Sequence, residues 1–217
     1  MSTDHFLWVS PFVDCNPYNH IILLVGPRKR KIFAHAAYIK TDSPIIGEVF
    51  LEPATGQFRT LELPDEDETV MRHYLIWSYE KKLPTSHVKS LTGGHDSDPC
   101  YSLLAGLYVS AERLGNQVIQ RDLITEFIRL TTIWKKELVC PPPMDSVNTI
   151  YRGTSSESKA RRLMVDLHLK FGEEKLLTPD FDMTFILDLA KAAVEMLHEV
   201  KEPYDSFFEE LKAINYQ

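Results

Sequence analysis

Short runs of aliphatic and β-branched residues mark the first part of the chain as strand-forming. Two such runs, residues 21–25 and 31–34, are separated by a segment that contains Gly26 and Pro27. Glycine and proline at this spacing are typical of a tight turn, so the pattern predicts a β-hairpin. A third strand is expected over residues 58–63, where apolar and polar side chains alternate toward the end of the run.

Helix signals are interleaved with these strands. Ser43 followed by Pro44 has the form of an N-cap and a first helical residue, which predicts a short helix reaching about Phe50. The acidic run at residues 65–68 suits the start of another helix, because carboxylates complement the exposed backbone amides there. Apolar residues at helical spacing continue this second helix to about Tyr79.

The remainder of the chain is patterned for helices. Residues 84–99 lack periodicity and are expected to form a surface loop, after which apolar positions recur at three- and four-residue spacing. Three consecutive prolines, residues 141–143, predict a stiff and extended linker between two sets of helices. The helices expected in this part span residues 103–114, about 117–132, 160–171 and 186–200, with a last short helix around Phe207, Phe208 and Leu211.

Strands mixed with helices, followed by helices alone, predict an α+β fold. We divide the chain into an N-terminal arm (residues 1–18), an α+β domain (19–135), a proline-rich linker (136–144) and a helical C-terminal extension (145–217). Within the domain we expect a small three-stranded sheet packed with helices, because only three strand-like runs are present.

The composition argues against several classes of protein, namely nucleic-acid-binding, membrane-spanning and secreted proteins. The 217 residues carry a net charge of −7 and a pI near 5.6, so the chain as a whole has no electrostatic footprint for nucleic acid or an anionic membrane. Its longest apolar run, residues 21–25, is too short to span a bilayer. The three cysteines, Cys15, Cys100 and Cys140, are far apart, and the N-terminus lacks the features of a secretory signal. We therefore expect a soluble intracellular protein, cytoplasmic or nuclear.

Several short motifs stand at the joints between the expected elements. They are, in order, Leu24-Val25-Gly26, Phe33-Ala34-His35, Ser43-Pro44, Leu61-Glu62-Leu63-Pro64-Asp65-Glu66-Asp67, Trp77-Ser78-Tyr79 and Leu107-Tyr108-Val109-Ser110-Ala111-Glu112-Arg113-Leu114-Gly115. In this order they resemble the BTB/POZ domain, particularly the stand-alone form common in fungi. The resemblance covers about residues 19–135. It implies a module that acts through protein–protein interaction, with no catalytic residue, cofactor or metal.

The resemblance also assigns structural positions within the domain. These are His35, Ser43, Pro44, Trp77, Tyr79, Tyr108, Ala111, Leu114 and Gly115. The chain departs from the family pattern at Asn19-His20, where an aspartate is frequent, and this departure argues against a charged pocket built on that aspartate. It departs again at residues 45–47, where Ile-Ile-Gly replaces the usual aromatic residues, which alters the expected packing of the short helix.

Two segments are candidate partner surfaces. The first is Phe50-Leu51-Glu52. BTB proteins that dock onto cullin-type ubiquitin-ligase scaffolds carry a hydrophobic-x-Glu triplet in this region of the domain. The resemblance therefore implies that Phe50 would fill a pocket on the scaffold and that Glu52 would fix the register. The same two residues also suit a core phenylalanine and a surface charge. An apolar cluster on the N-terminal arm suits either an isologous dimer interface or a dock on its own domain, and it comprises Phe6, Leu7, Trp8 and Val9.

An enzyme is the alternative from another class. Residue types used for acid–base chemistry or metal binding occur at His35, His87, His95, Asp96, Asp98 and Cys100. Their spacing matches neither a structural zinc motif nor a catalytic triad, so a helix-start histidine and a solvated loop are the simpler interpretations. The basic turn at residues 28–31 similarly suits a solvated turn, a nuclear-import signal or a nucleic-acid patch.

The sequence therefore predicts an interaction scaffold that forms a homodimer and recruits another protein. A substrate adaptor of a cullin-type ubiquitin ligase and a small metal-dependent enzyme are the alternatives. In the scaffold the C-terminal helices supply either stability or a partner surface. In the adaptor they would have to bind the substrate, because no recognisable substrate-binding domain follows.

Overall fold

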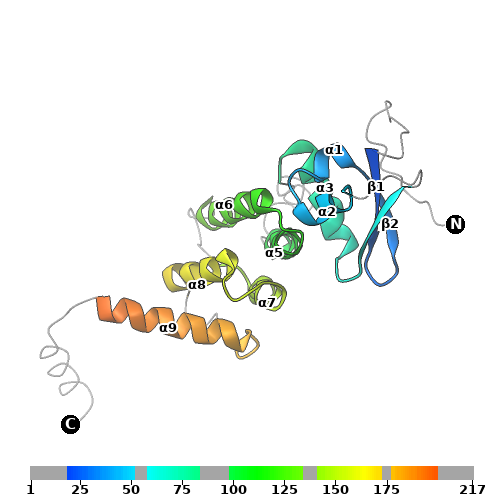
Figure 1. Ribbon diagram of the computed structural model, residues 1–217. Coiled ribbons are helices and arrows are strands. Elements are labelled where there is room, and N and C mark those ends of the chain that lie inside the picture. Colours follow the sequence, from blue (N-terminus) through cyan, green and yellow to red (C-terminus); the bar gives the residue numbers. More distant parts are fainter. Residues whose placement is uncertain (1–18, 52–57, 84–97, 134–140, 173–176, 200–217) are drawn as a thin grey trace, which may run out of the picture. The chain divides into compact units, whose positions relative to one another are not determined.

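The computed structural model describes residues 19–51, 58–83, 98–133, 141–172 and 177–199, and Figure 1 shows the path of the chain. The chain forms two compact units, Met1–Thr125 and Glu126–Gln217. The division falls inside helix α6 (Gln117–Ile133), which precedes the proline-rich linker expected from the sequence. Within the described residues the fold is mixed α+β, with eight helices and a three-stranded sheet, as the sequence predicts.

The sheet of the first unit has the strand order β2-β1-β3. Strands β1 (His20–Val25) and β2 (Arg30–His35) form the antiparallel hairpin that the sequence predicts. Strand β3 (Arg59–Leu63) pairs with β1 in parallel, so the most apolar strand occupies the centre. Because side chains alternate between the two faces of a strand, Ile21, Leu23 and Val25 all lie on one buried face.

Short helices and one long helix cover this buried face. Figure 1 shows α1 (Ala36–Ile39), α2 (Pro44–Glu48) and α3 (Glu68–Glu80) on one side of the sheet. The predicted caps are confirmed: the Ser43 hydroxyl accepts the Ile46 amide at 3.3 Å, and the Asp67 carboxylate accepts the amides of Thr69 and Val70. Each cap satisfies backbone donors that the first turn of a helix leaves unpaired.

Helix α5 (Asp98–Arg113) completes the first unit together with the first half of α6. It begins one turn before the expected helix, so residues 98 and 99 belong to a helix and not to a surface loop. Cys100 is consequently buried within α5 and takes part in no disulfide, which corrects its assignment to a solvated loop.

The second unit is helical throughout its described residues. It contains α7 (Met144–Gly153), α8 (Lys159–Phe171) and α9 (Met183–Glu199). Helix α7 was not predicted, because Ser146 and Asn148 occupy two of its buried positions and interrupt the apolar pattern. The short helix expected around Phe207 lies outside the described residues. No helix in the described part of the chain is both long and apolar enough to cross a membrane.

Aromatic rings fill the centre of the second unit. The ring of His168 lies 4.9 Å from that of Phe185 and 5.8 Å from that of Phe181, both edge-on. Its Nδ1 is 2.8 Å from the Met164 carbonyl, which can only accept, so Nδ1 carries the proton. Burial lowers the pKa of His168, and the hydrogen bond to Met164 offsets this only in part. His168 is therefore a neutral core residue at pH 7.

Acidification is expected to destabilise the second unit through His168. Its folded-state pKa lies below the unfolded value of 6.5, so the unfolded chain binds more protons between the two values. The stabilising contribution is complete above the unfolded pKa and is lost as the pH falls through 6.5 toward the folded pKa. Thermal unfolding followed by circular dichroism between about pH 8 and pH 5 measures this loss.

The His168→Gln variant isolates the effect, because the pKa of His35 in the first unit is also lowered by burial. The variant should show a shallower dependence of melting temperature on pH than the wild-type chain. Identical slopes for the two proteins would exclude His168 as a source of the acid sensitivity.

Candidate interaction surface

The face of the sheet opposite the helices carries large apolar side chains that remain accessible. Phe33 of β2 pairs across the ladder with Ile22 of β1, and it faces away from its buried neighbours Ile32 and Ala34. Phe33 is 54% exposed, and Phe58, which directly precedes β3, is 46% exposed. Their rings meet edge to face with centroids 6.3 Å apart. Exposed apolar side chains gathered in this way are typical of a binding surface.

This pair continues into a series of rings that we call the aromatic row. The His20 ring is 6.4 Å from that of Phe58 and 4.6 Å from that of His35. From His35 the row extends to Tyr38 and Tyr79, whose rings are 4.8 Å apart. The complete row comprises Phe33, Phe58, His20, His35, Tyr38 and Tyr79.

Hydrogen bonds fix the middle of the aromatic row. The backbone amide of His35 donates to the Tyr79 hydroxyl at 3.0 Å, so that hydroxyl is free to donate its own proton to His35 Nδ1, 2.9 Å away. Burial, and to a lesser degree His20, lowers the pKa of His35, and burial raises the pKa of Tyr79. Both groups are therefore neutral at pH 7. The arrangement orients the rings of His35 and Tyr79. It also occupies His35 Nδ1, the unprotonated ring nitrogen that a general base would need.

Four of the residues assigned by the resemblance meet at one corner of the first unit. The Ser43 hydroxyl, which caps α2, donates to the carbonyl of Leu114 at 2.7 Å. Gly115 follows with a φ of +70°, and a Cβ placed there would lie 3.4 Å from Pro44 Cδ. This left-handed turn ends α5 and directs the chain into α6. The Ser43-Pro44 and Leu114-Gly115 motifs are thus two sides of one contact.

Three of the other assigned residues are interior, whereas His35 and Tyr79 belong to the aromatic row. Trp77, Tyr108 and Ala111 are fully buried. The Trp77 indole N–H donates to Asp122 Oδ2 at 3.0 Å, and the Ala111 carbonyl accepts the Asn116 amide at 2.8 Å. These contacts join α3 to α6 and close the turn after α5. Their role is structural, because they hold the elements of the first unit in place.

In the segment after α2, the side chain of Phe50 is less exposed than that of a docking residue would be. Phe50 is half-buried, with the Arg59 guanidinium 5.0 Å and the Lys40 ammonium 6.0 Å from its ring centroid. Its neighbour Leu51 is 83% exposed. Glu52, the other residue of the expected cullin-type triplet, lies outside the described residues, as does the arm with Phe6, Leu7, Trp8 and Val9.

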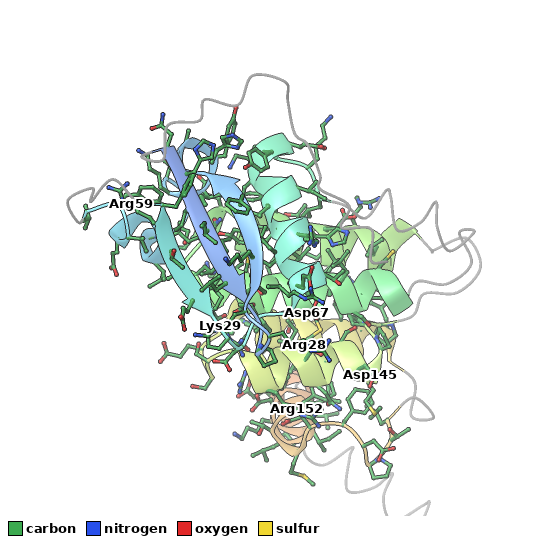
Figure 2. All side chains as sticks on the ribbon, turned by 90° about the vertical axis from the view of Figure 1, so that its right-hand side faces the viewer. Arg28, Lys29, Arg59, Asp67, Asp145 and Arg152 are labelled. Atoms are coloured by element: carbon green, nitrogen blue, oxygen red, sulfur yellow. The ribbon has the colours of Figure 1, made fainter. Side chains whose placement is uncertain are left out.

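The basic turn is partly neutralised. Lys29 forms an ion pair with Glu62 at 2.8 Å, and Arg30 lies 3.8 Å from Glu68. Figure 2 shows Arg28 and Lys29 at the hairpin end of the sheet, opposite the end that carries Arg59. A basic patch for nucleic acid needs uncompensated cations, so these ion pairs favour the interpretation as a solvated turn.

The candidate metal ligands that lie within the described residues do not form a metal site. His87, His95 and Asp96 lie outside the described residues. Across the residues that the structure does describe, no group of three or more His, Cys, Asp or Glu side chains is arranged to hold a metal ion. The aromatic row is therefore the best-defined candidate site of the first unit.

The aromatic row was missed by sequence reasoning, although part of its signal is visible in the chain. Phe33 stands between two residues that face the core, so strand alternation alone directs it outward. The contact of His35 with Tyr79 joins residues far apart in the chain and has no local signature.

A scan of the chain against protein-family models finds no match, and no curated protein is significantly similar to it.

Proposed function

We propose that this chain is a BTB/POZ-like interaction module that self-associates and recruits another protein. The order of elements supports this proposal: a strand hairpin, two short helices, a third strand and then longer helices match the order of the resemblance. The contacts at the Ser43 corner and around Trp77 add support, because the assigned motif residues meet as a shared framework would require.

The observation that carries the proposal is the open face of the sheet. Phe33 and Phe58 expose about half of their surface on a face that the helices of the first unit leave uncovered. Aromatic side chains held by neighbouring rings bind at a low cost in conformational entropy, and such residues are enriched at interface hot spots. The same face presented by two copies would give an isologous interface.

Loss of the two exposed rings is expected to weaken self-association. The double variant Phe33→Thr/Phe58→Thr retains strand propensity and removes the aromatic surface. We expect the concentration at which half of the chains are associated to rise at least about tenfold, which corresponds to about 1.4 kcal/mol. Sedimentation equilibrium of the intact chain measures this concentration.

Val118→Thr is the matched control, because Val118 is an exposed apolar residue on α6, away from the sheet. It should leave association unchanged. A wild-type chain that stays at 25.0 kDa at every concentration, or a double variant that associates as the wild type does, would refute the proposal.

A further inference from the structure

Helix α9 has apolar residues on two opposite faces, and only one of them is used within the second unit. On the used face Phe185 is fully buried, and its ring lies 5.4 Å from that of Tyr151 and 4.9 Å from that of His168. On the other face the apolar side chains are accessible: Met183 is 77% exposed, Leu187 52%, Val194 52% and Leu197 74%.

These accessible residues form a regular series, which we call the α9 stripe. It comprises Met183, Leu187, Ala190, Val194 and Leu197, all of them exposed. The spacing alternates between four and three residues, which is the hydrophobic repeat of a coiled-coil seam. A helix that packs on its own domain through one face does not need a second seam, so the α9 stripe points to a further helix as its partner.

The area of the stripe is sufficient for a specific contact between two copies. The exposed apolar surface of the α9 stripe amounts to roughly 400–500 Å² per copy. Apolar patches of this size on a protein surface are often functional. Two copies would bury roughly 1,000 Å² in total, which is where specific interfaces begin.

We infer that the α9 stripe pairs with the α9 stripe of a second copy of this chain, with the two helices antiparallel and centred on Ala190. In this arrangement Met183 of one copy faces Leu197 of the other, and the small side chain of Ala190 lets the helices approach at the centre. Antiparallel helices also oppose their macrodipoles, with the positive end of each beside the negative end of the other.

The charges beside the stripe are complementary in the same arrangement. Asp188, Lys191 and Glu195 lie along one flank of α9, and Lys191 Nζ is 3.9 Å from Asp188 Oδ1 of its own helix. An antiparallel copy reverses this order, so each Lys191 lies within one helical turn of the other copy's Asp188. The pairing therefore leaves each lysine next to acidic groups.

Cysteine cross-linking of the full-length chain tests both the contact and its direction. In Ala190→Cys the two thiols meet at the centre of the antiparallel pair, so a short bis-maleimide should yield a covalent dimer several-fold above the wild-type level. In Leu197→Cys the two thiols lie roughly 20 Å apart along the helices, because each residue rises 1.5 Å. This second variant should yield no more dimer than the wild-type chain with its own three cysteines.

Adding Leu187→Glu to Ala190→Cys should return the cross-link to the wild-type level, because it places two charges in the seam. Adding Phe33→Thr/Phe58→Thr should leave the cross-link intact, which separates this contact from the proposed sheet interface. An Ala190→Cys chain that does not cross-link would overturn the pairing and indicate that another segment or another protein covers the stripe. Equal cross-linking of Leu197→Cys would also overturn it, since it requires parallel helices.

Discussion

Replacing Trp77 by alanine is expected to remove about 3–5 kcal/mol from the free energy of unfolding of the first unit. Trp77 is fully buried in the last turn of α3, and its ring lies 6.4 Å from that of Tyr74. Truncation at such a site loses the transfer free energy of the indole and leaves a cavity that the neighbouring helices fill only in part. The truncation also removes the indole N–H that donates a hydrogen bond to Asp122.

Urea unfolding followed by far-ultraviolet circular dichroism measures this loss. The Trp77→Phe variant serves as the matched control, since it retains most of the ring volume and removes the hydrogen bond to Asp122. We expect it to cost about 1–2 kcal/mol, in line with a single hydrogen bond and a smaller ring. A loss below about 1 kcal/mol in Trp77→Ala would contradict a core role for this tryptophan.

Replacing Arg161 by alanine is expected to cost the second unit about 2–4 kcal/mol, because one guanidinium joins α8 to the end of α7. Its Nη2 donates to the carbonyls of Tyr151 and Thr154, each at 2.5 Å, and its Nε donates to the Thr154 hydroxyl at 3.2 Å. The guanidinium carbon also lies 4.8 Å from the centroid of the Tyr151 ring. A cation at the C-terminus of a helix is favoured, since the last carbonyls there have no partner within the helix.

Arg162 supplies the control for this prediction, because it is the next residue of α8 and its side chain is exposed. Arg162→Ala should change the stability by less than about 0.5 kcal/mol. Arg161→Lys should recover only part of the loss, since an ammonium cannot reproduce the planar, forked donor geometry. Equal urea midpoints for Arg161→Ala and Arg162→Ala would show that these hydrogen bonds do not contribute to folding.

Local signals in the chain were sufficient for most of the elements. The Gly26-Pro27 turn, the Ser43 cap and the acids before α3 were each interpreted from a few neighbouring residues, and each lies where it was expected. Among the acids, however, only Asp67 caps α3. Glu66 is buried instead, where it accepts from the Ser110 hydroxyl and lies 3.3 Å from Arg113. That role depends on α5, which lies far away in the sequence.

The surfaces were harder to predict than the elements, because exposure depends on contacts between distant segments. Leu197 continues the apolar pattern of α9, but it is 74% exposed. This helix is apolar around most of its circumference, so the pattern alone does not identify the face that packs. The aromatic row also depends on contacts between distant segments, since Phe58, His20 and Tyr79 come from three separate parts of the chain.

The parallel pairing of β1 with β3 has a consequence for the kinetics of folding. Ile21 meets Ala34 as soon as the hairpin closes, but it meets Arg59 only after α1 and α2 have returned the chain to the sheet. Contacts between distant residues form late, because the loop entropy must be lost before the contact is gained. One edge of the aliphatic strand β1 therefore stays unpaired early in folding. Nascent chains are most prone to aggregate during this interval, before β3 covers that edge.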